Sequence, residues 1–421
     1  MIPRAAPRQL GINVSTMTVV HPIARAWIST GGTGARNYDE FADEAEISEI
    51  IQANPDSALA IEMPHRAPAS AGKSFTTALP DAVERLARQR ADGSYAPAEN
   101  VIALYRIAEP GWPDEAAYGI FAMVDTDQIS TSAGDPGLVI RNEDVFLDKV
   151  RERAALAEAT GHLLSPVLLL QTATGAALHA AIRSAVESAG APAVTDIDHA
   201  GRTHSVWPVA DGPLAAELTA LASGGELVVA DGNHRTLAAQ FGGLRRFLAV
   251  ITTPDSVAIQ PYHRLVTELP VPQKELLDGM RSAGFEIEER DGAPGIPPAT
   301  AVHLYVHGRT FYAGLPMGPG ANNSLVDAMA HAKVERLVLG DGLGLEPGDK
   351  RIIYVGGDYP PEWLAGEVDA GRAAMAILIA PVPVAEFVDV NLARQKMPRK
   401  STWFTPKARA GLVLADLAAE G

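Results

Sequence analysis

Five consecutive residues able to do chemistry follow the apolar run 227–230: Asp231, Gly232, Asn233, His234 and Arg235. A strand-to-helix junction of this kind suits an anion, because the first helical turn offers unpaired backbone N–H groups and the positive end of the helix dipole. Gly232 allows close approach of a ligand to the backbone, and Asn233 and Arg235 can donate to phosphate oxygens. We expect Asp231 to orient a substrate or hold a metal, and His234 to titrate near neutral pH. An ordinary helix cap is the alternative interpretation.

Four charged residues surround the start of a predicted helix over 143–160: Arg141, Glu143, Lys149 and Arg153. Lys149 and Arg153 are one turn apart and share a helix face. A carboxylate ahead of such cations can act as a general base while the cations bind phosphate, so Glu143 is the candidate base. The same spacing also fits a solvated helix surface.

Two later segments carry further candidate ligands for phosphate: His263 and Arg264, and then Lys400, Ser401, Thr402 and Lys407. The second group belongs to 397–407, the densest basic cluster of the chain, which also contains two aromatic residues. We expect it to stack a base and neutralise phosphates; an aromatic-anchored tether is the alternative. A structural role is the alternative for His263. The glycine-rich loop 30–37 is either a second phosphate cradle or a surface loop.

The elements that must position these residues alternate between strands and helices, which indicates an α/β (α+β) fold. Predicted strands lie at 101–107, 118–124, 167–171, 227–230 and 246–251. Predicted helices lie at 38–52, 81–92, 176–188, 214–223 and 323–338, and a short strand is predicted at 60–64. We divide the chain into an N-terminal α/β segment (1–95), a core (96–265) and a C-terminal α/β domain (266–421).

The amino-acid composition narrows the range of functions that the protein can have. The 421 residues carry 35 Lys and Arg against 51 Asp and Glu, so a net charge of −16 disfavours nucleic acid as a partner. Cysteine is absent, which excludes disulfides and thiol nucleophiles. No apolar stretch approaches the ~20 residues that a membrane helix needs. We expect a cytoplasmic protein that binds a small-molecule substrate and no membrane; homo-oligomer formation stays open.

The four segments, in this order, resemble the DUF1015 family, whose hallmark is a strand ending in A-D-G-H-H-R. Here Ala230–Arg235 matches it. The family's R-H-E with a later K-x-x-x-R resembles 141–153, its P-x-H-R-L-V resembles 261–266, and its M-P-x-K-S-T-x-F-x-P-K resembles 397–407. Asn142 and Asn233 stand where the family usually has His. Asn37-Tyr38-Asp39 is the remnant of its N-terminal P-P-Y-D.

The D-G-x-x-R element also resembles that of the ParB/sulfiredoxin superfamily, which includes free-serine kinases. The resemblance implies a ParB/sulfiredoxin-like core with additional N- and C-terminal segments. It further implies transfer of phosphate from ATP or another nucleotide, with Mg²⁺, to the hydroxyl of a small metabolite such as free L-serine. Two alternatives stay open: a nucleotide-hydrolysing switch, and a non-catalytic sensor of nucleotides or amino acids.

Overall fold

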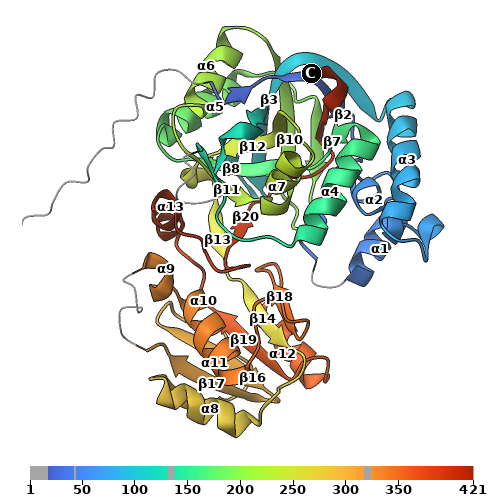
Figure 1. Cartoon of the computed structure of the whole chain (residues 1–421). Coiled ribbons are helices and arrows are strands. Elements are labelled where there is room, and N and C mark those ends of the chain that lie inside the picture. Colours follow the sequence, from blue (N-terminus) through green and yellow to red (C-terminus); the bar gives the residue numbers. More distant parts are fainter. Residues whose placement is uncertain (1–17, 42–43, 131–136, 317–323, 421) are drawn as a thin grey trace, which may run out of the picture.

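The chain forms a large lobe and a small lobe in a computed structural model that describes residues 18–41, 44–130, 137–316 and 324–420 (Figure 1). The large lobe contains a 13-stranded sheet, and the small lobe contains a six-stranded sheet. Helices pack against both sheets (Figure 1). The fold is therefore mixed α/β, which confirms the predicted class.

The strands of the large sheet follow the order β5-β6-β11-β8-β12-β4-β3-β2-β21-β7. In addition, β1 pairs with β4, and β10 joins β3 to β9. Their bounds are β1 (Val20–His21), β2 (Ile23–Ser29), β3 (Tyr95–Glu109), β4 (Trp112–Asp125), β5 (Ile129–Ser130), β6 (Val139–Ile140), β7 (His162–Leu163), β8 (Val167–Gln171), β9 (Val194–Ile197), β10 (Thr203–Ala210), β11 (Leu227–Asp231), β12 (Arg246–Thr252) and β21 (Val413–Asp416).

The central strands are apolar without alternation because both faces of this sheet are buried. Along β8, Val167 and Leu169 enter one hydrophobic core, whereas Leu168 and Leu170 enter another on the opposite face. Successive side chains of a strand point to opposite faces, so a continuous apolar run fills both cores. The strands predicted at 167–171, 227–230 and 246–251 are confirmed.

Eight α-helices lie outside the small lobe in the described residues: α1 (Glu44–Ala53), α2 (Leu59–Glu62), α3 (Leu79–Ala91), α4 (Leu147–Thr160), α5 (Gly175–Ser188), α6 (Pro213–Ala222), α7 (Asn233–Phe241) and α13 (Val384–Leu392). The strand predicted at 60–64 is wrong, since these residues belong to α2 and the turn after it. All four residues of α2 are buried. A fully buried short helix lacks the polar face that distinguishes it from a strand.

The small lobe, residues 263–379, has the strand order β15-β17-β16-β19-β14-β18. Its elements are β14 (His263–Val266), α8 (Gln273–Ser282), β15 (Glu286–Asp291), β16 (Ala301–Val306), β17 (Arg309–Gly314), α9 (Leu325–Ala328), α10 (Ala330–Lys333), the π-helix Val334–Gly340, α11 (Asp341–Leu343), β18 (Ile352–Val355), α12 (Pro361–Asp369) and β19 (Met375–Ile379). The predicted helix 323–338 is interrupted at Met329, which has an extended backbone.

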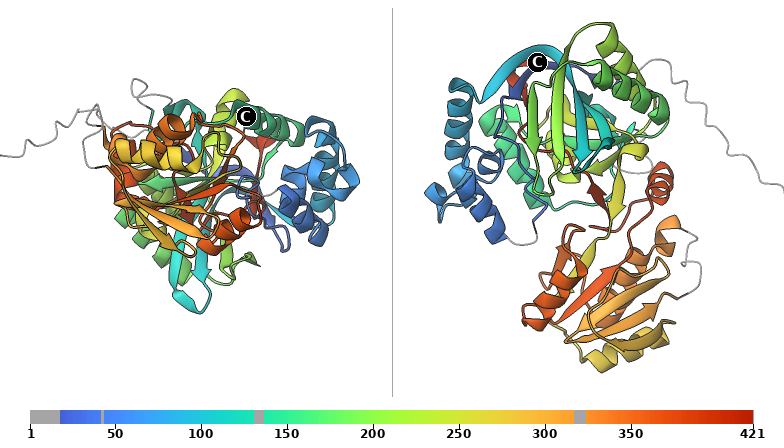
Figure 2. Two further views of the ribbon diagram at one scale, coloured as in Figure 1. Left: turned by 90° about the horizontal axis from the view of Figure 1, so that it is seen from below. Right: turned by 180° about the vertical axis from the view of Figure 1, so that it is seen from behind.

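The chain crosses between the lobes twice. On the way out it passes through β13 (Ala258–Gln260), which pairs with β20 (Trp403–Thr405) on the way back (Figures 1 and 2). We call residues 397–407 the return segment, and they lie at the junction of the two lobes. Further along the chain, β21 completes the large sheet between β2 and β7. This arrangement differs from the expected division at 266, because the last strand belongs to the large lobe.

Candidate functional site

A small polar pocket lies where the β11–α7 turn meets residues 142–143 and the return segment. We call it the polar pocket. Its walls are Asp39, Asn142, Glu143, Ala230, Asp231, Gly232, Asn233, His234, Tyr262, Lys400, Thr402, Trp403 and Lys407. The structure thus brings together eight of the predicted site residues: Glu143, Asp231, Gly232, Asn233, His234, Lys400, Thr402 and Lys407. The free volume is only about 20 Å³, room for about one water molecule.

The β11–α7 turn places the start of a helix at this pocket. Gly232 has φ of 96°, a left-handed conformation that other residues adopt only with strain. A Cβ at this position would lie 3.0 Å from Nε of Arg235, so the turn is also closely packed. The first N–H groups of α7, at Asn233 and His234, have no partner within the helix. The pocket therefore receives the positive end of a nine-residue helix.

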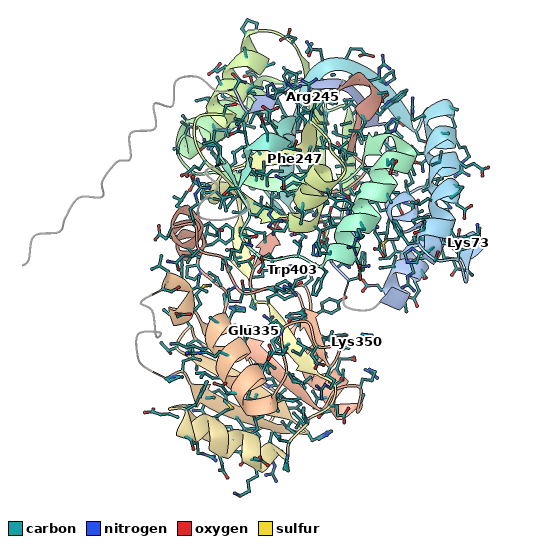
Figure 3. All side chains as sticks on the ribbon, in the orientation of Figure 1. Lys73, Arg245, Phe247, Glu335, Lys350 and Trp403 are labelled. Carbon is teal, nitrogen blue, oxygen red and sulfur yellow. The ribbon has the colours of Figure 1, made fainter. Side chains whose placement is uncertain are left out.

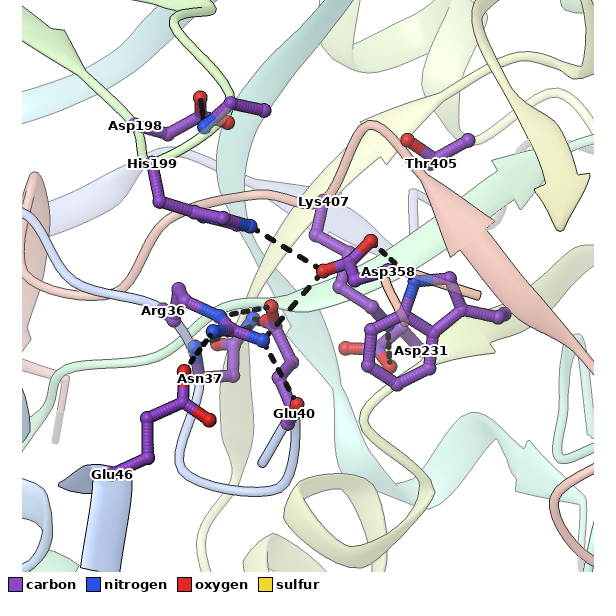
Figure 4. A network of polar contacts seen from close by, with 12 residues as sticks. Arg36, Asn37, Glu40, Glu46, Asp198, His199, Asp231, Asp358, Thr405 and Lys407 are labelled. Atoms are coloured by element: carbon purple, nitrogen blue, oxygen red, sulfur yellow. Dashed lines mark hydrogen bonds and ion pairs between the residues drawn. The ribbon is translucent and has the colours of Figure 1, made fainter. Parts of the chain in front are cut away.

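Asp231 is held between two cations at the edge of the pocket. Its carboxylate lies 2.8 Å from Nζ of Lys407 and 2.6 Å from a terminal nitrogen of Arg235. Burial acts to raise the pKa of Asp231, but Lys407 and Arg235 outweigh it and hold that pKa well below the ordinary value. Figure 4 shows Asp231 beside Lys407. Asp231 is thus a charged anchor rather than a proton acceptor.

Arg235 points away from the polar pocket, contrary to the expectation that it binds phosphate. Its guanidinium donates to Oδ1 of Asn37 at 3.0 Å, to the carbonyl of Pro166, and to Asp231. The side chain is buried among these partners and does not line the pocket. Adjacent positions on a helix project about 100° apart, so His234 faces the pocket and Arg235 faces the interior. Arg235 positions Asp231.

His234 is neutral at physiological pH. Its Nε2 accepts a hydrogen bond from the backbone N–H of Phe146 at 3.1 Å, and the two rings are parallel with centroids 6.0 Å apart. Burial, together with nearby Lys400, lowers the pKa of His234 to about 4. The expectation that it titrates near neutral pH is therefore wrong. With Nε2 accepting, the neutral ring carries its proton on Nδ1.

Glu143 and Lys400 lie together on the opposite wall. Oε2 of Glu143 accepts a hydrogen bond from the backbone N–H of Lys400 at 2.8 Å. Burial raises the pKa of Glu143. Burial opposes the charge of Lys400, but electrostatic interactions with Tyr262, Asp39 and Glu143 outweigh it and raise the pKa of its ammonium. The pocket therefore combines a carboxyl of raised pKa with a permanent positive charge.

The two asparagines that replace family histidines contact each other. Nδ2 of Asn233 donates to Oδ1 of Asn142 at 2.5 Å. Oδ1 of Asn233 is buried and has no hydrogen-bond partner. The two positions that depart from the family pattern therefore contact each other in the pocket wall. Oδ1 of Asn233 stays free to accept a hydrogen bond from a ligand.

The predicted ligands at 263, 264 and 401 support the pocket from outside. Arg264 is fully buried, pairs with Glu335 at 2.9 Å, and donates to the carbonyls of Lys400 and Arg399 at 2.9 and 3.2 Å. His263 accepts from the N–H of Ile379 at 3.1 Å, and burial lowers its pKa to about 3. Ser401 is buried, and its hydroxyl has no partner. Arg264 thus fixes the return segment and does not line the pocket.

The cations at 141, 149 and 153 do not line the polar pocket either. Lys149 pairs with Glu152 at 3.1 Å on the outer side of α4. Arg153 is buried with its guanidinium 4.0 Å from the ring centre of Tyr38. Arg141 is buried, and burial lowers its pKa. The expectation that these cations bind phosphate beside Glu143 is therefore not met. The helix α4 directs Arg153 toward Tyr38 and Lys149 toward solvent, and Arg141, which precedes α4, is buried outside the pocket lining.

Five residues of the pocket wall were not predicted as site residues: Asp39, Asn142, Ala230, Tyr262 and Trp403. Asp39 lies in the remnant of the family's N-terminal motif, and its Oδ1 is buried without a partner. Tyr262 and Trp403 lie inside the recognised segments; the ammonium of Lys400 is 5.6 Å from the ring centre of Tyr262, and that of Lys407 is 4.6 Å from the ring centre of Trp403. Tyr262 directly precedes His263 and Trp403 directly follows Thr402, and these positions were the available signal.

The glycine-rich loop 30–37 packs against the segment after the return segment. Ala35 pairs with Ala410, and Thr33 donates to the carbonyl of Gly411 at 2.7 Å. None of its residues lines the polar pocket. The loop ends at Asn37, which connects it to Arg235.

Metal clusters and membrane spans are both absent from the described residues. No group of three or more histidine, aspartate or glutamate side chains there is arranged to hold a metal ion. In the same part of the chain, no helix is long and apolar enough to cross a membrane.

Comparisons with known proteins give a family and several distant structures. The model of a family described as "Protein of unknown function (DUF1015)" matches residues 33–337. A conserved hypothetical protein from Pyrococcus furiosus is 13% identical with a TM-score of 0.38, covering 69% of this chain and 95% of that one. A free serine kinase in complex with AMP is 14% identical with a TM-score of 0.41, covering 72% and 93%. SbnI with a C-terminal truncation, from Staphylococcus aureus, is 13% identical with a TM-score of 0.39, covering 71% and 88%. No curated protein matches.

Proposed function

The chain belongs to the DUF1015 family, and from the geometry of its polar pocket we propose that it transfers a phosphoryl group from ATP or a related nucleotide to the hydroxyl of a small metabolite such as free serine. The observation that carries this proposal is that Glu143, which accepts a hydrogen bond from the backbone N–H of Lys400, lines one pocket with the side chain of Lys400 and the start of α7. Phosphoryl transfer needs mainly positioning and neutralisation of charge, and these groups supply both.

Each group has a role that its surroundings support. The ammonium of Lys400 and the first N–H groups of α7 bind phosphate oxygens. Glu143, whose pKa is raised by burial, takes the proton of the acceptor hydroxyl. The hydroxyl oxygen forms a bond to the γ-phosphorus as the bond to the β–γ bridging oxygen breaks, and its electron pair leaves with the nucleoside diphosphate. Nδ1–H of His234 donates to the substrate.

Mg²⁺ fits this pocket only as a partner of the nucleotide. Asp231 is already neutralised by Lys407 and Arg235, so Asp39, with an unpartnered Oδ1, is the carboxylate free to approach a cation. Mg²⁺ is commonly bound through one or two carboxylates together with phosphates and water. When bound, the ion would neutralise phosphate charge.

Substrate entry requires the walls of the polar pocket to move apart. The free volume of about 20 Å³ is far below the ~300 Å³ at which small-molecule sites begin. One wall belongs to the β11–α7 turn and the other to the return segment and Tyr262, next to the small lobe. We therefore infer that the described conformation is a closed one, and that the pocket admits a nucleotide when these walls move apart.

To test this proposal, the protein is incubated with ATP, Mg²⁺ and a panel of hydroxyl-bearing metabolites that begins with serine. The amounts of ADP, free phosphate and phosphorylated acceptor are then measured. A phosphorylated acceptor supports the kinase. Free phosphate formed without any acceptor identifies a hydrolysing switch instead, and tight nucleotide binding with neither product identifies a sensor.

Three variants test the assigned roles. Glu143→Gln should lower kcat by about 10²–10⁴-fold with nucleotide affinity retained. Lys400→Met should weaken nucleotide binding. Lys149→Met, a matched loss of one lysine on the outer side of α4, should change neither. Unchanged turnover in Glu143→Gln would remove Glu143 from the reaction.

A further inference from the structure

A second cavity, separate from the polar pocket, lies inside the large lobe between α4, α7 and the strands β7, β8 and β12. Its volume is about 470 Å³, within the ~300–1,000 Å³ typical of small-molecule sites. The cavity opens to solvent on one side, and its volume suits a small-molecule occupant.

Most of the wall is apolar. Leu156, Leu164, Val167, Phe247 and Leu248 line the cavity, and Phe247 lies within the large lobe in Figure 3. The space exists because α4 and α7 face each other there with alanines, including Ala157 and Ala238. The exposed side chains of Arg151 and Phe241 line its outer side. An apolar group of moderate size fits this wall.

Two opposite charges also line the cavity, and they are not paired with each other. Glu62 is 3% exposed and Arg153 is 6% exposed, yet no ion pair within 4.0 Å joins them. Oε1 of Glu62 accepts from Ser165 at 2.5 Å, whereas Oε2 has no hydrogen-bond partner. Nε and one terminal nitrogen of Arg153 also have none. Burial raises the pKa of Glu62, although Arg153, Ser165 and Arg235 act in the opposite direction.

Buried polar atoms without partners are costly and rare, so each needs an explanation. The free acceptor is on Glu62 and the free donors are on Arg153. A ligand that satisfies both must carry a hydrogen-bond donor and a hydrogen-bond acceptor. An alkyl carboxylate would satisfy Arg153 and leave Glu62 unpaired, and an alkylamine would do the reverse.

We propose that this cavity binds an apolar α-amino acid, with its ammonium on Glu62, its carboxylate on Arg153 and its side chain against Val167 and Phe247. The zwitterion adds no net charge to the interior and satisfies both orphaned groups. Arg235 also lines the cavity and holds Asp231 of the polar pocket at 2.6 Å. The occupant therefore touches the side chain that positions Asp231.

Titration calorimetry and thermal shift on the full chain test this proposal without nucleotide, so the outcome is independent of phosphoryl transfer. The probes are leucine and phenylalanine, with 4-methylpentanoate and isoamylamine as analogues that keep one charge each, and glycine as the amino acid without an apolar side chain. Leucine or phenylalanine should raise the melting temperature and bind at least tenfold more tightly than the analogues and glycine.

Variants locate the site. Glu62→Gln and Arg153→Met should each weaken binding at least tenfold. Ala238→Leu fills the cavity and should abolish binding, whereas Ala159→Leu, an exposed alanine of α4 outside the cavity, should leave it unchanged. If Arg153→Met does not fold, Ala238→Leu still decides the location. Equal binding of the one-charge analogues, unchanged binding in folded Ala238→Leu, or no binding of either amino acid overturns the proposal.

Discussion

His234 shows at the scale of one residue how burial alters the chemistry that a sequence suggests. The folded-state pKa of about 4 lies below the ordinary value of 6.5, so the unfolded chain binds the proton first as the pH falls. The free energy of unfolding contributed by His234 is therefore fully present above pH 6.5 and decreases as the pH falls from 6.5 toward 4.

We predict that urea unfolding between pH 7 and pH 4 shows this loss, and that His234→Gln reduces it. Other buried histidines, such as His263, shift in the same direction, so the difference between the two proteins isolates His234. NMR titration of the ring should find its pKa near 4. A ring that titrates near 6.5 in the folded protein would contradict the neutral, accepting imidazole described above.

Asp231 gives a second prediction at this scale. Asp231→Asn leaves Lys407 and Arg235 without their buried counter-charge, so we expect a loss of about 3 kcal/mol in the free energy of unfolding. Asp278→Asn removes an exposed carboxylate that pairs with Lys274 and Arg281, and it should have a much smaller effect on the free energy of unfolding. Because the folded pKa of Asp231 is depressed, its contribution is present above pH ~4 and is lost as the pH falls below that value. Equal costs at both positions would show that Asp231 is not an anchor.

The sequence predicted which segments meet in the pocket better than it predicted which side chains face it. Asp231, Glu143, Lys400 and Lys407 line the pocket as expected. Arg235 does not, although it is adjacent to His234, because helical geometry separates neighbouring side chains and no spacing rule indicates which one faces the ligand.

At the scale of elements, the β11–α7 turn depends on Gly232. Gly232→Ala combines an unfavourable φ with contact to Arg235, and we expect a cost of about 2–3 kcal/mol. Gly243, at the other end of α7, has φ of 68°, and a Cβ added there would meet nothing within 4 Å, so Gly243→Ala should cost only about 1 kcal/mol. Chemical denaturation of both variants measures the difference, and equal losses would show that close packing on Arg235 is unimportant.

Apolar runs determined most elements correctly, and the errors have physical causes. Strand 167–171 follows from its uninterrupted apolar residues, whereas the buried helix α2 shares that composition and was mistaken for a strand. The pairing of β21 with β2 joins residues nearly the whole chain apart, and local patterns contain no information about such a contact.

At the scale of the whole molecule, Asp358 connects the small lobe to the large one. Its carboxylate lies 3.6 Å from Arg36 and 3.5 Å from His199, and it accepts from the indole N–H of Trp403 at 3.0 Å (Figure 4). Asp358→Asn should weaken this junction and favour separation of the lobes. We expect faster amide exchange over 397–407, measured by hydrogen–deuterium exchange, with Asp278→Asn as the control that leaves the junction intact. Unchanged exchange there would mean that other contacts hold the lobes closed.

The late position of β21 also sets when the polar pocket can be completed during synthesis of the chain. The first and last strands of the small lobe, β14 and β19, are neighbours in one sheet, and the lobe contains its own hydrophobic core. It can therefore fold before the residues after 379 have left the ribosome. The large sheet must wait for residues 413–416, and Lys407 reaches Asp231 only after the return segment has emerged. A nascent chain that stops before the end of the return segment therefore lacks both a sheet neighbour for β2 and a cation of the polar pocket, so premature termination there yields a product with an incomplete site.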